Sequence, residues 1–121
     1  GRKACDAWKE RMDGELARHW VAPFFFAIGR RDALDADSVK AFAAALAKLD
    51  AEIGDRGSFH DDPDMAVCDL RVAEWAIYAL PGEGLLERIP LFHKFRKVYG
   101  IEAGSLPNLE RFLAPWNERL A

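Results

Sequence analysis

The sequence predicts an all-α fold, a five- to six-helix bundle that occupies the whole chain, residues 1–121. Apolar residues recur at helical spacing through most of its length. Strand signals are almost absent, because no run of β-branched residues alternates with polar ones and no Asn-Gly hairpin turn occurs. Apolar residues make up 50% of the chain and charged residues 31%, as in ordinary globular domains.

The first predicted helix runs from about Lys3 to Ile28. Its large apolar residues fall at i, i+4 spacing and form one stripe: Trp8, Met12, Leu16 and Trp20. Pro23 is expected to bend or end the regular part, and Gly29 marks the stop. Core packing is one interpretation of such a stripe, and contact with a ligand is the other.

The second predicted helix starts near Asp35 or Asp37, since either carboxylate can cap a first turn. An Ala-rich segment with one apolar face follows, and Gly54 ends it. The stretch 55–64 is rich in Gly, Ser, Asp and Pro, which is typical of a loop.

The third predicted helix, about Met65 to Leu80, is apolar on nearly every face, which is typical of a helix at the centre of a bundle. Asp69 lies in its first turn, where a carboxylate can accept hydrogen bonds from unpaired N–H groups, so we expect Asp69 to be a structural helix cap. A fourth helix should begin at Pro90 and end at Gly100, and a last helix should follow Pro107.

Charge and composition argue against several classes of partner. The net charge is −3 without a basic block, so we expect no nucleic-acid partner. The longest apolar run, Trp20 to Ile28, is too short to span a bilayer, and no signal peptide is visible, so we expect no membrane partner.

The cysteines and histidines, which often act in catalysis or metal binding, lie in separate parts of the sequence. Cys5 and Cys68 lie in separate helical patterns, and we favour two buried free thiols in a reducing compartment over a disulfide or a redox pair. The three histidines, His19, His60 and His93, share no metal-ligand spacing, so no metal site is expected. No Ser-His-Asp set or phosphate-binding loop occurs either, and we assign no catalytic residue.

The order of these elements resembles one known family. A long helix precedes an antiparallel second helix and a central helix with an early Asp. The segments Ile89-Pro90-Leu91-Phe92 and Leu106-Pro107-Asn108-Leu109 then open the last two helices. The chain is similar to the C-terminal helical domain of cytosolic glutathione S-transferases of the alpha, pi, mu and sigma classes. It departs from the family pattern at Ala66, where a Ser or Thr usually completes a capping box with the central Asp.

The resemblance implies that a second domain carries part of the function. In the family, a thioredoxin-like N-terminal domain binds glutathione as co-substrate and activates its thiol, and that domain is absent here. The helical domain supplies a wall of the hydrophobic electrophile pocket and the dimer interface, which implies substrate-binding roles for Trp8, Met12 and Leu16. Asp6 falls at the position from which an Asp contacts the glutathione ammonium across the dimer. The alternative from the residues themselves is that Asp6 complements the helix dipole.

Two functions from different classes remain open on this resemblance. The first is the C-terminal half of a cytoplasmic, homodimeric glutathione transferase that binds hydrophobic small molecules and has no activity as this chain alone. The second is a non-catalytic interaction module, because similar helical domains occur in translation elongation factor subunits and aminoacyl-tRNA synthetases. The retained acid at Asp6 favours the first.

Overall fold

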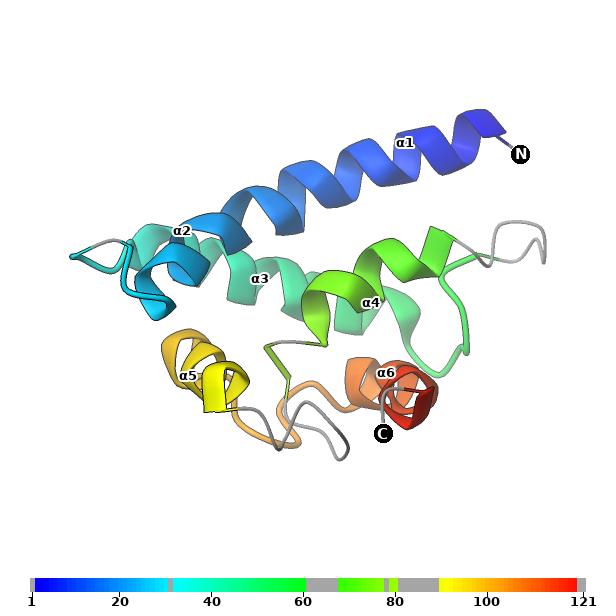
Figure 1. Cartoon of the computed structure of the whole chain (residues 1–121). Helices are drawn as coiled ribbons and strands as arrows, with labels where there is room; N and C mark the ends of the chain where they lie inside the picture. Colours follow the sequence, from blue (N-terminus) through cyan, green and yellow to red (C-terminus); the bar gives the residue numbers. More distant parts are fainter. Residues whose placement is uncertain (1, 31, 61–67, 78, 81–89, 120–121) are drawn as a thin grey trace.

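The structure is a computed structural model that describes residues 2–30, 32–60, 68–77, 79–80 and 90–119. Within these ranges every regular element is helical, which confirms the all-α class (Figure 1). The elements in chain order are α1 (Arg2–Met12), a π-helical segment η1 (Asp13–Ala17), α2 (Arg18–Ala27), α3 (Ala36–Ile53), α4 (Leu70–Ala76), α5 (Pro90–Tyr99) and α6 (Pro107–Arg119). The glutathione transferase type of bundle remains a prediction.

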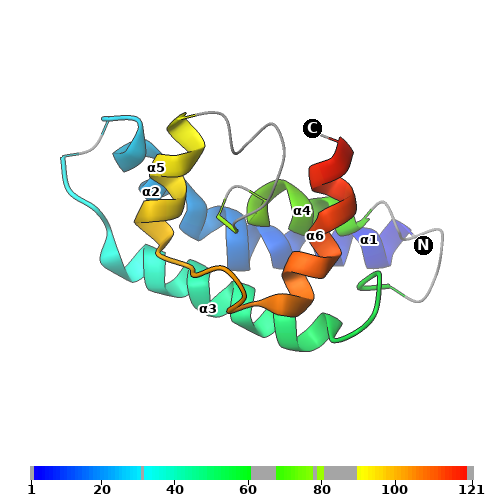
Figure 2. The ribbon, with the colours of Figure 1, turned by 90° about the horizontal axis from the view of Figure 1, so that it is seen from below.

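The first three elements form one continuous rod, with α3 running back against it (Figures 1 and 2). The π-helical segment explains how the i, i+4 stripe stays on one side. Four residues of a regular α-helix turn through about 400°, so such a stripe drifts by roughly 40° at each step. The wider π turn takes up an extra residue and reverses part of this drift. Met12 and Leu16 are consequently both fully buried.

The helix continues through Pro23 to Ala27, so this residue does not end it. Pro23 is itself fully buried, so its packing offsets the lost backbone hydrogen bond. The end at Gly29 is confirmed, because Gly29 has a φ of 81°, which favours glycine.

The limits of α3 follow the sequence signals. The Asp35 carboxylate accepts hydrogen bonds from the Ser38 N–H at 3.2 Å and from the Ser38 hydroxyl at 3.0 Å, which confirms the predicted cap. At the other end, Asp50 Oδ1 accepts the Leu109 N–H of α6 at 2.9 Å. The Arg111 guanidinium donates to the carbonyl of Gly54, just beyond α3. The end of α3 and the start of α6 therefore form one hydrogen-bonded junction.

The α4 helix lies between α1 and α6 (Figures 1 and 2) and supplies fully or almost fully buried side chains to the core, Val72, Ala73 and Ala76. This agrees with the expected central helix, although the described helix covers only part of the predicted span. Cys68 and Asp69 form a 3₁₀ turn before it, and residues 65–67, including Ala66, lie outside the described part. On the other side of the core, Tyr99 of α5 stacks on Phe42 at 4.6 Å between ring centroids.

The expectation of two free thiols is wrong, because Cys5 and Cys68 form a disulfide with a Cα–Cα distance of 5.9 Å. The pair lies 63 residues apart in sequence and joins α1 to the turn that precedes α4. Packing of the N-terminal helix against the central one brings the two Cα atoms within bonding range. Burial, which favoured free cysteines in the sequence, is equally compatible with a cross-link.

An ion-pair network connects the rod to the C-terminal half of α3. The Arg11 guanidinium donates to both carboxylate oxygens of Glu52, at 2.8 and 2.6 Å, and also to Glu15 at 3.2 Å. Lys48 reaches Glu15 at 3.4 Å. The hydrogen bonds from Arg11 lower the pKa of Glu52 below its usual value, and those to Glu52 raise the pKa of Arg11.

We expect this network to make stability depend on pH. Because the Glu52 pKa is lower in the folded chain, its contribution is present above the usual value of about 4.5 and is lost as pH falls through the folded pKa. The pair is partly exposed, so the loss should be about 0.5–1 kcal/mol. Urea unfolding over an acidic pH series should show a shallower decline for Glu52→Gln. Glu10→Gln, an exposed change on α1, should keep the original slope, and equal slopes for all three proteins would contradict the assignment.

Candidate functional site

One group of side chains brings α1, the loop after α3 and the turn before α4 together. Its members, which we call the Trp8 cluster, are Trp8, Arg11, Phe59, His60 and Asp69. The Trp8 ring meets His60 edge-on at 4.7 Å between centroids and lies 5.4 Å from the Phe59 ring. The Arg11 guanidinium lies 5.1 Å from the centroid of the same indole, within range of a cation–π contact.

The expected helix-capping role of Asp69 concerns N–H groups of residues 65–67, which lie outside the described part of the chain. Asp69 makes no side-chain hydrogen bond to the N-terminus of α4. Its carboxylate instead accepts the Ser58 hydroxyl at 2.6 Å and the Phe59 N–H at 3.1 Å, and it lies 3.8 Å from His60 Nε2. A buried carboxylate needs hydrogen-bond donors, and the loop after α3 provides them. Asp69 therefore fastens this loop to the start of the central helix.

We expect Asp69→Asn to lower the free energy of unfolding by about 1–3 kcal/mol, because one buried acceptor becomes a donor opposite Ser58 or Phe59. Chemical denaturation measures the loss, and Asp32→Asn in an exposed loop should change stability by less than about 0.5 kcal/mol. A double-mutant cycle with Ser58→Ala isolates the bond. Strictly additive effects in that cycle would show that Asp69 acts elsewhere.

The Trp8 cluster does not have the geometry of a nucleophilic triad. The Ser58 hydroxyl donates to Asp69 and also accepts the His60 backbone N–H at 3.1 Å. Its proton is therefore already used in a hydrogen bond to the carboxylate. A histidine base would have to hold that hydroxyl proton instead. The His60 and Asp69 side chains are only 9% and 7% exposed. This arrangement is suited to holding α1, the loop and α4 together.

The structure separates the residues for which the resemblance implied ligand contacts. Met12 and Leu16 are 0% exposed and belong to the core, so for these two residues the burial favours the core interpretation over contact with a substrate. Trp8 is partly buried at the edge of that core. Asp6 is exposed on α1, and the first turn of α1 holds no acid, so the helix-dipole interpretation of Asp6 loses its support.

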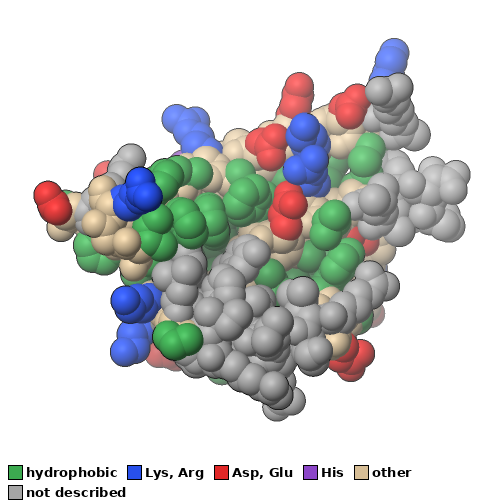
Figure 3. Space-filling model, viewed as in Figure 1, with side chains coloured by type: hydrophobic (Ala, Val, Ile, Leu, Met, Phe, Trp, Pro, Cys, Tyr) green, Lys and Arg blue, Asp and Glu red, His purple; other side chains and the backbone are tan. Residues whose placement is uncertain are grey.

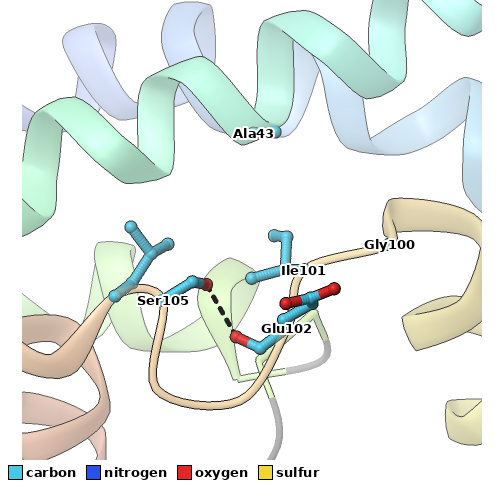
Figure 4. A pocket seen from close by; sticks show the side chains of 6 residues that line it. Ala43, Gly100, Ile101, Glu102 and Ser105 are labelled. Carbon is cyan, nitrogen blue, oxygen red and sulfur yellow. Dashed lines mark hydrogen bonds between the residues drawn. The ribbon is translucent and has the colours of Figure 1, made fainter.

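A shallow groove of about 310 Å³ lies between α3 and the loop that joins α5 to α6 (Figure 4). Its apolar lining comes from Ala43, Ile101 and Leu106, and the remaining lining residues are Gly100, Glu102 and Ser105. The Ser105 hydroxyl is used within the loop, where it donates to the Glu102 carbonyl at 2.6 Å. The groove therefore presents few polar groups to a ligand. Sequence reasoning missed it because α3 and this loop meet only in the fold.

Metal and membrane interactions find no support in the described part of the chain. No group of three or more His, Cys, Asp or Glu side chains there could hold a metal ion. No helix in it combines the length and apolar character required to cross a membrane. His93 was singled out in the sequence, but its side chain lies outside what the structure describes.

Comparison with known proteins adds no relative: no protein-family model, no curated protein and no solved structure matches this chain. Candidate functions therefore have to be argued from the helices and side chains described above.

Proposed function

We propose that this chain is the helical half of a protein of the glutathione transferase type, working with a separate glutathione-binding domain. The observation that carries the proposal is the central position of α4, with the buried Asp69 directly before it. An antiparallel pair of long helical segments precedes α4, and helices starting at Pro90 and Pro107 follow it, in the order on which the resemblance rests.

In this proposal the chain shapes a binding site and supplies no chemical step. The group that would stabilise the glutathione thiolate lies in the other domain, so the chain alone should not conjugate glutathione to an aryl halide. Met12 and Leu16 are buried, which leaves Trp8 as the implied substrate-binding residue with surface to offer. Asp6 is exposed and would contact the glutathione ammonium across a homodimer.

A test follows from the exposure of Asp6. In the full-length native protein, we expect Asp6→Asn to raise the KM for glutathione roughly tenfold or more, since a charge-assisted hydrogen bond contributes about 1.5–3 kcal/mol. Stability should not change, because Asp6 is exposed on α1. Steady-state kinetics with an aryl halide measure the effect, and Asp13→Asn, an exposed change farther along the rod, is the matched control.

Three results would contradict all or part of the proposal. They are a native protein whose intact mass leaves no room for a second domain, a full-length protein without glutathione-dependent turnover, and equal KM values for the Asp6 and Asp13 variants. The first two would reject the transferase function, and the third would reject the role of Asp6.

The second candidate is a non-catalytic interaction module, and one observation favours it. Apolar side chains gather over α2 on the face seen in Figure 3. Val21 of α2 is 41% exposed, and Leu34, in the connection to α3, is 38% exposed. Exposed apolar surface of this kind often marks a protein contact. A native complex that lacks glutathione-dependent activity and dissociates on Val21→Glu would support this function over the first.

A further inference from the structure

The disulfide is the main attachment of the N-terminal end of α1. Between residues 3 and 10, every residue except Cys5 and Trp8 is exposed. Cys5 is bonded to Cys68, and Trp8 packs against Phe59 and His60. The next attachment along the helix is the ion pair between Arg11 and Glu52. Among the described residues, the first turn and a half of α1 is therefore held by one covalent bond and one aromatic contact.

The two cysteines of this bond differ in their exposure to solvent. Cys5 is partly exposed on α1, whereas Cys68 is only 2% exposed in the turn before α4. Thiol–disulfide exchange requires a thiolate to approach one sulfur in line with the bond, so the accessible sulfur is the one attacked. The geometry assigns this role to Cys5.

We propose that Cys5 is a site of reversible S-thiolation by small monothiols, and that this exchange releases the N-terminal turns of α1. The incoming thiolate forms a new S–S bond to Cys5 Sγ, the Cys5–Cys68 bond breaks, and its electron pair leaves with Cys68, which takes a proton from solvent. A second monothiol then attacks the mixed disulfide and leaves Cys5 as a thiol, with the monothiol recovered as its own disulfide.

The consequences should remain local. The Trp8 ring keeps its contacts with Phe59, His60 and Arg11, and the core around Met12 and Leu16 does not include the cysteines. Residues 2–7 should therefore lose order while α3 stays intact. The inference does not depend on the proposed transferase function, because the exchange needs only an accessible sulfur and a monothiol.

The test treats the oxidised native protein with increasing glutathione, quenches with acid, and maps the adducts by peptide mass. We expect one glutathionyl group on Cys5 and a free thiol on Cys68. Amide exchange at residues 2–7 should become faster by roughly tenfold or more and approach that of an unfolded peptide, while α3 stays folded and remains far better protected than residues 2–7. The double variant Cys5→Ala, Cys68→Ala should show fast exchange at residues 2–7 from the start and should not respond to glutathione.

Several results would overturn the inference. An adduct found mainly on Cys68 would contradict the assignment from solvent access, and an intact disulfide at high glutathione would show that neither sulfur can be attacked. Loss of protection throughout α3 to the level of residues 2–7 would show that the bond holds the whole fold together and not the end of one helix. A double variant whose exchange at residues 2–7 matches that of the oxidised protein would show that Trp8 alone holds the turns.

Discussion

Val72→Asp is expected to leave the chain largely unfolded at 25 °C. Val72 is 0% exposed at the centre of the bundle, where the described contacts offer no partner for a charge. Burying an unpaired carboxylate and losing the Val packing together cost several kcal/mol, against a total stability of about 5–15 kcal/mol. Far-UV circular dichroism with urea titration should show the loss of a cooperative transition.

Leu70→Asp is the matched control, because it introduces the same charge two residues earlier on the same helix. Leu70 is 43% exposed, and an acid at the start of a helix is favourable. This variant should unfold cooperatively, with a change of no more than about 0.5 kcal/mol. If Val72→Asp also unfolds cooperatively at close to the original midpoint, α4 is not the buried centre of the bundle.

The elements predicted correctly from sequence carry their signals locally. The α3 helix has a capping Asp35, a repeating apolar face and Gly54 at its end, all within one stretch of chain. Gly54 has a φ of 54°, in the region that favours glycine. Pro90 and Pro107 are also local signals. They mark the starts of α5 and α6, because proline fits the first helical position.

The π-helical segment was missed, although the sequence contained a usable signal. An i, i+4 stripe that continues from Trp8 to Trp20 cannot stay on one side of a regular α-helix, because each step adds about 40°. Either some members of the stripe leave the core or the helix widens. Gly14 lies inside the segment that widens, between Met12 and Leu16.

The error at the cysteines and the unforeseen partners of Asp69 have a different cause. Asp69 binds Ser58 and Phe59, which belong to a loop whose path is fixed by the packing of α3 and α4. Its position in the first turn of a predicted helix pointed only to local donors. One signal could have pointed to further partners: a lone acid in a helix that is apolar on nearly every face is buried, and a buried carboxylate can also take donors from a segment packed against it.

Removal of the disulfide should produce the second large effect. In the oxidised protein the bond closes a long loop, since its cysteines are 63 residues apart, and it thereby limits the conformations of the unfolded chain. For a loop of this length the chain-entropy model gives about 4 kcal/mol, and measured values are commonly about 2–4 kcal/mol. We expect Cys5→Ala combined with Cys68→Ala to lower the Tm by on the order of 10 °C.

Single variants and a reductant separate the bond from the side chains. In the oxidised protein, Cys5→Ala alone should lose nearly as much stability as the double variant, because either change removes the cross-link. Adding a dithiol reductant should lower the Tm of the original protein to near that of the double variant and leave the variant itself unchanged. Cys68 is 2% exposed, so Cys68→Ala also removes buried sulfur and should be slightly the more harmful single change. A Tm that does not respond to reductant would show that the two thiols are not bonded in solution, and the remaining losses would then measure packing alone.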